Sequence, residues 1–107
     1  MVTFEQFQEI DLRVVKILTA ERVEASEKLL KLIVKDSEGE RIIVAGIGKA
    51  YEPEALIGKE IVIIANLEPR TLMGIESQGM LLAVSDTDGK PVILYPEREV
   101  PPGTRLG

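Results

Sequence analysis

The fold of this chain is decided by residues 30–45, which read LKLIVKDSEGERIIVA. Apolar and polar side chains alternate over the first part of this stretch, as in a strand with one buried face. A short turn at 37–39 then leads into a second apolar run at 41–45. We therefore predict a β-hairpin with one basic face. The basic side chains expected on that face are Lys31, Lys35 and Arg41.

The chain before the hairpin predicts a short helix and a bent first strand. Residues 3–6 form a capping-box pattern that opens a short helix carrying Phe4 and Phe7 on one face. This helix is expected either to cover one end of the domain or to meet a partner. A strand begins at Asp11, and its apolar phase slips by one residue at 14–15. Such a slip predicts a bulge or sharp bend at that point.

The chain after the hairpin predicts a second short helix and two further strands. The helix is expected at 51–58, the strands at 59–65 and 80–84. This order of elements is that of an OB-fold, a five-stranded Greek-key barrel. We predict an all-β fold in one domain, residues 1–107. The proline-rich segment beyond Ser85 is an extension that either seals the barrel or meets a partner.

Composition restricts the kinds of function. The chain is 45% hydrophobic and 29% charged, as in ordinary globular proteins. It has no cysteine and no histidine, which removes disulfides, zinc–thiolate sites and the commonest general base. No apolar run approaches the roughly 18 residues of a membrane span, and the N-terminus lacks the basic start of a signal peptide. We predict a cytoplasmic protein that is not an enzyme and holds no metal or cofactor.

The charge distribution is uneven. The net charge of −5 has the wrong sign for a protein that binds polyanions over its whole surface. Residues 13–35 differ, because they hold six basic against three acidic side chains. A short basic stripe can attract a nucleic acid while the rest of the surface stays acidic.

The connection at 66–79 is too specific for a simple turn. It contains Arg70, Ser77 and Gln78, which no turn requires for backbone reasons. OB-folds bind ligands on the second and third strands and on the loops after the first and fourth, and this connection is the latter loop. An arginine can fork two hydrogen bonds onto a phosphate, and short polar side chains suit the ribose 2′-hydroxyl. Few aromatic residues are available for stacking bases, which favours a folded RNA recognised by shape.

Three stretches resemble a known family. They are ANLEPRTLMGIESQGMLL at 65–82, DLRV at 11–14 and VPPG at 100–103. They resemble the tRNA-binding domain found at the C-terminus of methionyl-tRNA synthetases, in free-standing tRNA-binding proteins and in cytokine-like synthetase cofactors. The resemblance implies contact with the outer elbow of tRNA and assembly as a homodimer, with or without a methionyl-tRNA synthetase catalytic region. The predicted tRNA-binding residues are Lys28, Lys31, Arg41, Asn66, Arg70, Ser77 and Met80.

Two other functions are weighed beside tRNA binding. A chaperone-like OB-fold protein that binds peptides belongs to the same superfamily, and the low basic content suits it. An enzyme or cation site at Asp86 and Asp88 is the weakest alternative, because Asp-x-Asp-Gly between two strands is typical of a turn.

Overall fold

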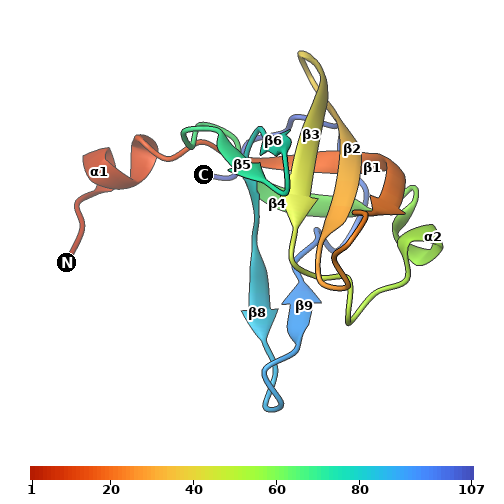
Figure 1. Ribbon diagram of the computed structural model, residues 1–107. Helices are drawn as coiled ribbons and strands as arrows, with labels where there is room; N and C mark the ends of the chain where they lie inside the picture. Colours follow the sequence, from red (N-terminus) through yellow and green to blue (C-terminus); the bar gives the residue numbers. More distant parts are fainter.

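A computed structural model describes residues 1–107 and is built around a curled antiparallel sheet (Figure 1). The strand order in this five-stranded sheet is β3-β2-β1-β4-β7. Two small hairpins, β5–β6 and β8–β9, extend from it. The sheet strands are β1 (Leu12–Arg22), β2 (Leu30–Asp36), β3 (Gly39–Ala45), β4 (Glu60–Ile64) and β7 (Met80–Leu81). The remaining elements are α1 (Phe4–Gln8), α2 (Pro53–Leu56), β5 (Arg70–Leu72), β6 (Ile75–Ser77), β8 (Ala83–Ser85) and β9 (Pro91–Ile93). The predicted all-β barrel with two short helices is confirmed.

The β2–β3 hairpin is tight and its register is unbroken. Asp36 faces Gly39, whose φ of 130° closes the turn in a conformation that glycine tolerates best. Apolar side chains of β2 at even-numbered positions point inward, so Lys31 and Lys35 point outward as predicted. Both strands pair through seven residues, from Leu30 opposite Ala45 to the turn.

One apolar cluster fills the barrel. Strands β1 to β4 supply most of it, Leu56 of α2 closes one end, and Ile93 of β9 enters from the C-terminal extension. Burying side chains of this size stabilises the fold by roughly 1.5–3 kcal/mol each. The members are Val15, Ile17, Leu30, Leu32, Val34, Ile43, Ala45, Ile47, Leu56, Ile61, Ile63, Ala65 and Ile93.

The bulge predicted at residues 14–15 is wrong. β1 pairs with β4 without interruption from Leu12 to Lys16, and the register shifts further on, between Ile17 and Thr19 against β2. Val14 and Val15 are both buried because both faces of β1 are covered there. Val15 joins the core, while the C-terminal segment lies against Val14: Gly103 donates to its carbonyl at 2.7 Å.

The C-terminal extension therefore seals the barrel. The predicted strand 80–84 divides into two: Met80 and Leu81 pair with β4, and Ala83–Ser85 turns away to pair with β9. The last residues run antiparallel to the start of β1, with Arg105 opposite Arg13 and the Leu106 amide donating to the Leu12 carbonyl at 2.9 Å. Of the two roles predicted for this extension, the structure shows the first.

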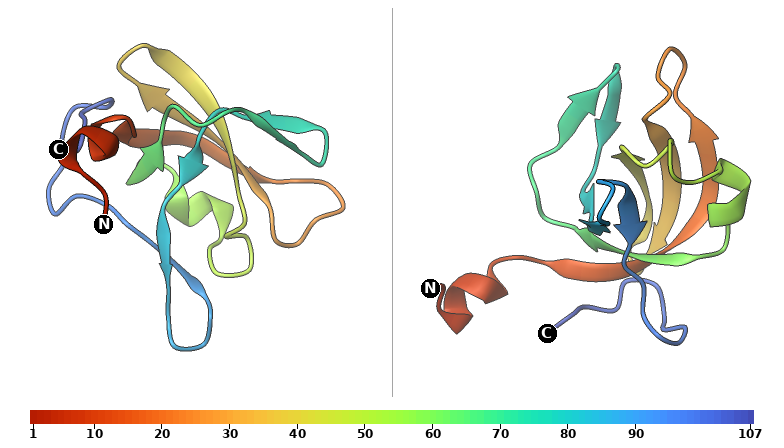
Figure 2. Two further views of the ribbon diagram at one scale, coloured as in Figure 1. Left: turned by 90° about the vertical axis from the view of Figure 1, so that its left-hand side faces the viewer. Right: turned by 90° about the horizontal axis from the view of Figure 1, so that it is seen from below.

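Helix α1 stands away from the barrel (Figures 1 and 2). Its predicted capping box is present, with Thr3 and Gln6 bonded to each other's backbone amides. It contains no buried residue, and Phe4 is 66% exposed. The prediction that it covers the end of the domain is therefore wrong. Neither helix is long and apolar enough to cross a membrane.

Candidate nucleic-acid interface

The β1–β2 loop and the β5–β6 hairpin project from the same side of the barrel (Figure 2). Between them lies a cleft of about 550 Å³. Arg22 and Lys31 line one wall together with Glu21 and Glu24, and Met73 and Ile75 line the other. The Lys31 ammonium lies 3.8 Å from Glu21, a distance that leaves it free to exchange that partner for another anion.

A smaller cleft on the other flank of the hairpin contains two more of the predicted residues. Arg70 is exposed, makes no ion pair within the chain, and shares this cleft with Met80 and Leu67. Met80 is 42% exposed, so its thioether side chain presents an apolar surface beside a cation. This pairing suits the sugar and phosphate of a nucleotide.

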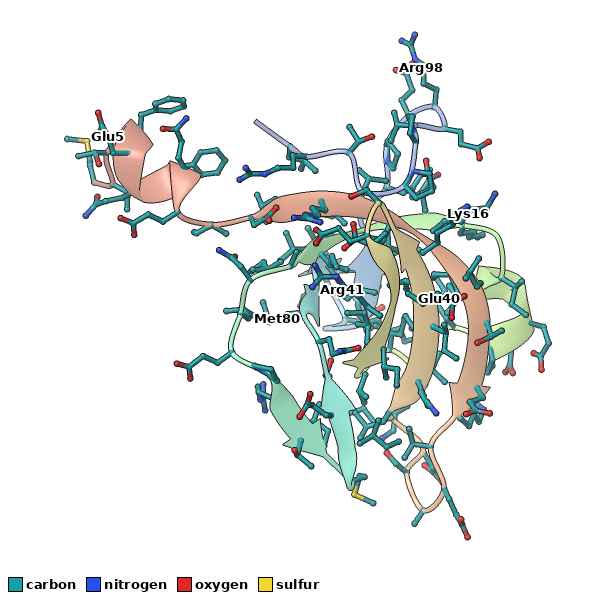
Figure 3. The ribbon with its side chains drawn as sticks, turned by 90° about the horizontal axis from the view of Figure 1, so that it is seen from above. Glu5, Lys16, Glu40, Arg41, Met80 and Arg98 are labelled. Atoms are coloured by element: carbon teal, nitrogen blue, oxygen red, sulfur yellow. The ribbon has the colours of Figure 1, made fainter.

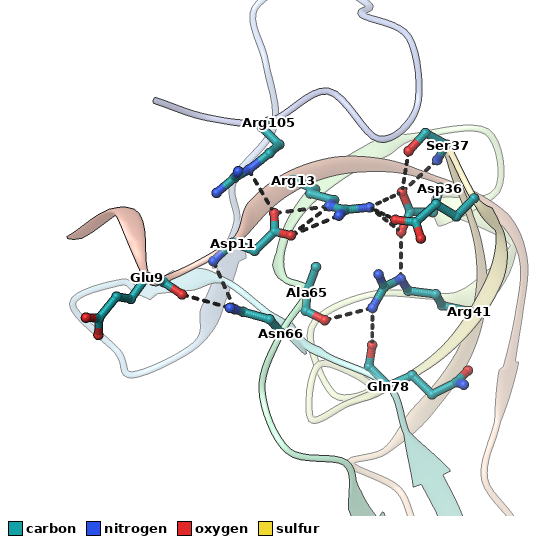
Figure 4. A network of polar contacts seen from close by, with 11 residues as sticks. Glu9, Asp11, Arg13, Asp36, Ser37, Arg41, Ala65, Asn66, Gln78 and Arg105 are labelled. Carbon is teal, nitrogen blue, oxygen red and sulfur yellow. Dashed lines mark hydrogen bonds and ion pairs between the residues drawn. The ribbon is translucent and has the colours of Figure 1, made fainter. Parts of the chain in front are cut away.

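The prediction that Arg41 lies on the outward face with Lys31 and Lys35 is wrong. Arg41 pairs with Val34, an inward position, so its side chain turns inward as well. Its Nε lies 2.6 Å from Asp36, and its Nη1 donates to the carbonyl oxygens of Ala65 and Gln78 (Figure 4). Every hydrogen bond described for this guanidinium is therefore internal.

Ser77 and Gln78 join β3 to the rest of the barrel. The Ser77 hydroxyl accepts from the Val44 amide and donates to the Gly79 carbonyl, both at 2.9 Å. Gln78 exchanges two hydrogen bonds with the Ile42 backbone. Since β3 is an edge strand, these bonds satisfy amides that would otherwise be unpaired. Ser77 is only 4% exposed, and both hydrogen bonds of its hydroxyl are made within the chain.

Asn66 fixes the entry of the chain into the barrel. Its Nδ2 donates to the Glu9 carbonyl at 2.7 Å, and its Oδ1 accepts from the Asp11 amide at 2.9 Å (Figure 4). Both ends of the amide side chain are thus used in holding the segment between α1 and β1. Its predicted contact with tRNA stays a prediction, as do those of Arg41 and Ser77, but the structure gives all three a stabilising role.

A network of charges surrounds Asp36, whose side chain is 1% exposed. Burial alone raises the pKa of this carboxyl, but hydrogen bonds from Arg41, Arg13 and the Ser37 amide outweigh burial and lower it. Arg13 also binds Asp11, and its hydrogen bonds lower the pKa of that carboxyl. The network holds β1, β2 and β3 together at the end of the barrel opposite α2.

The Asp86 carboxylate is an acceptor within a turn. Its Oδ1 accepts from the amides of Asp88 and Lys90 in the β8–β9 connection. No group of three or more acidic side chains lies close enough together to hold a metal ion.

The comparisons with known proteins identify the family. The family model for a tRNA-binding domain matches residues 12–105. The chain belongs to this tRNA-binding domain family. It is 50% identical over 105 residues to the C-terminal region of methionine–tRNA ligase from Archaeoglobus fulgidus, covering 98% of this chain but only 16% of the ligase.

Two solved structures match the whole fold of this family member. A methionyl-tRNA synthetase-related protein from Pyrococcus horikoshii superposes with a TM-score of 0.93 at 36% identity, covering 100% of this chain and 98% of that one. The chaperone CsaA from Bacillus anthracis superposes with a TM-score of 0.91 at 32% identity, covering 100% and 99%. The fold alone therefore does not separate a synthetase-related role from a chaperone role, whereas the high-identity relatives are ligases.

In this family member, the sequence prediction missed several exposed groups around the candidate interface. Arg22 and Met73 line the larger cleft, and Lys49 and Lys90 lie beyond the β1–β2 loop. None belongs to a motif, so only the fold brings them near the residues predicted from the sequence. Four of the predicted residues remain exposed or partly exposed near these clefts: Lys28, Lys31, Arg70 and Met80.

Proposed function

We propose that residues 1–107 form a single non-catalytic module that binds tRNA by its shape, as the C-terminal domain of a methionine–tRNA ligase or as a free-standing cytoplasmic relative. The observation that carries this proposal is the cleft between the β1–β2 loop and the β5–β6 hairpin, in a chain of the tRNA-binding domain family. Lys31 on one side of the hairpin and Arg70 on the other provide cations for phosphates.

The position of the aromatic residues favours a folded RNA over an extended strand. Binders of single strands stack successive bases on aromatic side chains. Here the Tyr51 hydroxyl accepts from the Ile93 amide inside the domain, while Phe4 and Phe7 belong to α1. Tyr95 lines a different cavity. Without stacking platforms at the clefts, recognition depends on how phosphates and riboses are arranged in space.

Binding of total tRNA over a range of salt concentrations tests this function. With three or four phosphates neutralised, log K against log salt should have a slope of roughly −2 to −4. Lys31→Ala and Arg70→Ala should each weaken binding and make the slope shallower by about 1, with unchanged thermal unfolding. Arg98→Ala is the matched control, because Arg98 is exposed on the side away from the β5–β6 hairpin (Figure 3).

The peptide-binding alternative is supported by the structural similarity to the chaperone CsaA. The same protein should therefore be tested for binding to an unfolded polypeptide under identical conditions. If polypeptide binds while tRNA does not, or if both substitutions leave tRNA affinity unchanged, the tRNA-binding proposal is wrong and the chaperone role takes its place. A slope steeper than about −7 would mean a broad basic surface, which the acidic net charge argues against.

We further propose that the domain is a homodimer and that α1 contributes to the interface. Phe4 and Ile10 are exposed large apolar side chains, and with Phe7 and Leu106 they line a cleft of about 270 Å³ between α1 and the C-terminus. Contiguous apolar surface of this kind usually marks an interface, and two-fold pairing is the commonest assembly. Light scattering at micromolar concentration tests it: a mass of one 11.8 kDa subunit would refute the dimer.

A further inference from the structure

Three lysines from distant parts of the chain line one cleft of about 350 Å³. Lys28 comes from the β1–β2 loop, Lys49 from the β3–α2 connection, and Lys90 from the end of the β8–β9 turn. We propose that this basic cleft receives a backbone phosphate of the tRNA bound at the main interface. This inference rests on the proposed function and extends its contact surface onto two segments that carry none of the predicted site residues.

Backbone contacts fix two of these lysines relative to each other. The Gly48 amide donates to the Lys28 carbonyl at 2.7 Å, and a Cβ at residue 48 would lie 2.7 Å from the Glu27 carbonyl oxygen. Gly48 thus allows the β3–α2 connection to pack directly on the β1–β2 loop. Arg22 strengthens this contact by donating to the Gly48 carbonyl at 2.9 Å. Lys49 follows immediately and is held beside Lys28.

The side chain of Lys28 lies across a neighbouring glycine. A Cβ at Gly46 would come within 2.9 Å of the Lys28 Cε, so the absence of a side chain at 46 makes room for the lysine stem. Gly46 lines the same cleft. The Lys28 ammonium is therefore directed along this wall, and part of its conformational freedom is already lost before a ligand arrives.

The third lysine is placed by an ordered turn. The Lys90 amide donates to the Asp86 carboxylate at 2.9 Å, and the Asp86 amide donates back to the Lys90 carbonyl at the same distance. Gly89 adopts a φ of 79° within this turn and also lines the cleft. These bonds hold the backbone at Lys90, so that its side chain faces the cleft from a defined position.

The charge of the cleft is uncompensated within the chain. None of the three lysines makes an ion pair, whereas Lys16 and Lys31 do. No carboxylate lines the cleft, although the chain as a whole carries a net charge of −5. Three unpaired ammonium groups around one hollow in an otherwise acidic protein attract a polyanion there in preference to the rest of the surface.

The basic cleft and the main cleft lie on either side of the β1–β2 loop. The β1–β2 loop separates the two: Val23 to Ala25 line the main cleft, and Lys28 lines the basic one. The loop, the β3–α2 connection and the β8–β9 turn all lie at the lower side of the barrel in Figure 1. An RNA backbone that leaves the main cleft past this loop therefore meets the three lysines next.

The test is tRNA affinity of the intact chain as a function of salt. The double substitution Lys49→Ala/Lys90→Ala should weaken binding about tenfold and make the slope of log K against log salt shallower by about 1, the loss of one phosphate contact. Thermal unfolding should not change, because both side chains are exposed. Lys49→Arg/Lys90→Arg should keep parental affinity, and Arg98→Ala provides a control for loss of a distant cation.

The outcomes distinguish this inference from the function on which it rests. If Lys31→Ala weakens tRNA binding while the double substitution leaves affinity and slope at parental values, the basic cleft is not a contact and the proposed function stands. If the parental chain does not bind tRNA, both fail. If the double substitution lowers affinity without changing the slope, a phosphate contact is refuted.

Discussion

Replacing Asp36 by asparagine tests the role of the buried charge network. The Asp36 carboxylate accepts hydrogen bonds from Arg13, Arg41 and the Ser37 amide, and its side chain is 1% exposed. Asp36→Asn keeps the volume but removes the charge and places an NH₂ group against a guanidinium. Breaking a buried pair by changing one partner costs about 3–5 kcal/mol. Because Arg13 keeps Asp11 and Glu38 as partners, we expect a loss of unfolding free energy at the lower end of this range, about 3 kcal/mol.

The expected change in melting temperature follows from the size of the chain. Unfolding entropy is about 2.1 cal/mol/K per residue, or about 0.22 kcal/mol/K for 107 residues. A loss of about 3 kcal/mol therefore lowers the Tm by about 13 °C at pH 7. Far-UV circular dichroism during heating measures it, at one fixed protein concentration because any dimerisation also shifts the Tm. Asp88→Asn is the control, since the exposed Asp88 side chain has no hydrogen-bond partner.

The effect should depend on pH in a defined direction. Because folding lowers the pKa of Asp36, its charge stabilises the protein above the unfolded pKa of about 4 and stops doing so as pH falls through the lower folded pKa. The Tm difference between parent and Asp36→Asn should thus be full at pH 7 and shrink at pH 2–3. A difference below about 3 °C at pH 7, or one that persists undiminished at pH 2, would refute the reasoning.

Three further substitutions test closure of the barrel and assembly. Arg41→Ala should cost about 3 kcal/mol in urea unfolding by breaking the pair with Asp36, and a parental urea midpoint would contradict this. Gly79→Ala should destabilise the folded protein by a similar amount, about 3 kcal/mol. The φ of residue 79 is 141°, and the new Cβ would lie 2.8 Å from the Ile64 carbonyl oxygen. A parental urea midpoint would contradict this prediction. Phe4→Ser should shift the light-scattering mass toward 11.8 kDa without lowering the circular dichroism signal of the folded protein. An unchanged dimer mass would show that α1 is not part of the interface.

Much of the fold could be predicted because its signals are local. Alternating side chains along 30–45, the turn between them and the capping box at the N-terminus each depend on a few neighbouring residues. The phase slip at Val14 and Val15 reflects burial on both faces of β1 and not the predicted bulge. A strand that is buried on both faces has the same run of adjacent apolar residues as a strand with a bulge. The two are distinguished here only by the distant residues Gly103 and Thr104, which bond to the backbone of Val14.

The inward direction of Arg41 follows from the register of the β2–β3 hairpin. A two-residue turn at Ser37–Glu38 sets Asp36 opposite Gly39, which puts Arg41 opposite Val34. Val34 belongs to the apolar set of β2, so Arg41 must share its inward direction. The register of the hairpin therefore predicts an inward Arg41.

The roles of Ser77 and Asn66 could not be predicted in the same way. Their partners, Val44, Glu9 and Asp11, lie 33, 57 and 55 residues away and are reached through backbone groups, which every residue possesses. A polar side chain that pairs with a distant amide leaves no pattern in sequence. The polar stretch after β4 thus contains residues that bond to the backbone of the domain and residues that stay on the surface, and composition alone does not distinguish them.

The structure divides that stretch between closing the barrel and contacting a ligand. Asn66, Ser77 and Gln78 pair with backbone groups of the domain, whereas Arg70 and Met73 on the projecting hairpin and Met80 of β7 keep exposed side chains. The bonds of Ser77 and Gln78 anchor the C-terminal end of the hairpin to β3, and Met73 and Ile75 of the hairpin line the larger cleft with the β1–β2 loop. Helix α1 stands apart from the β5–β6 hairpin (Figures 2 and 3). A dimer formed through α1 therefore leaves both clefts open, and two weakly charged surfaces at a fixed separation gain affinity for one folded RNA through effective concentration. The proposed dimer would in this way offset the net charge of −5, which argues against a broad basic surface.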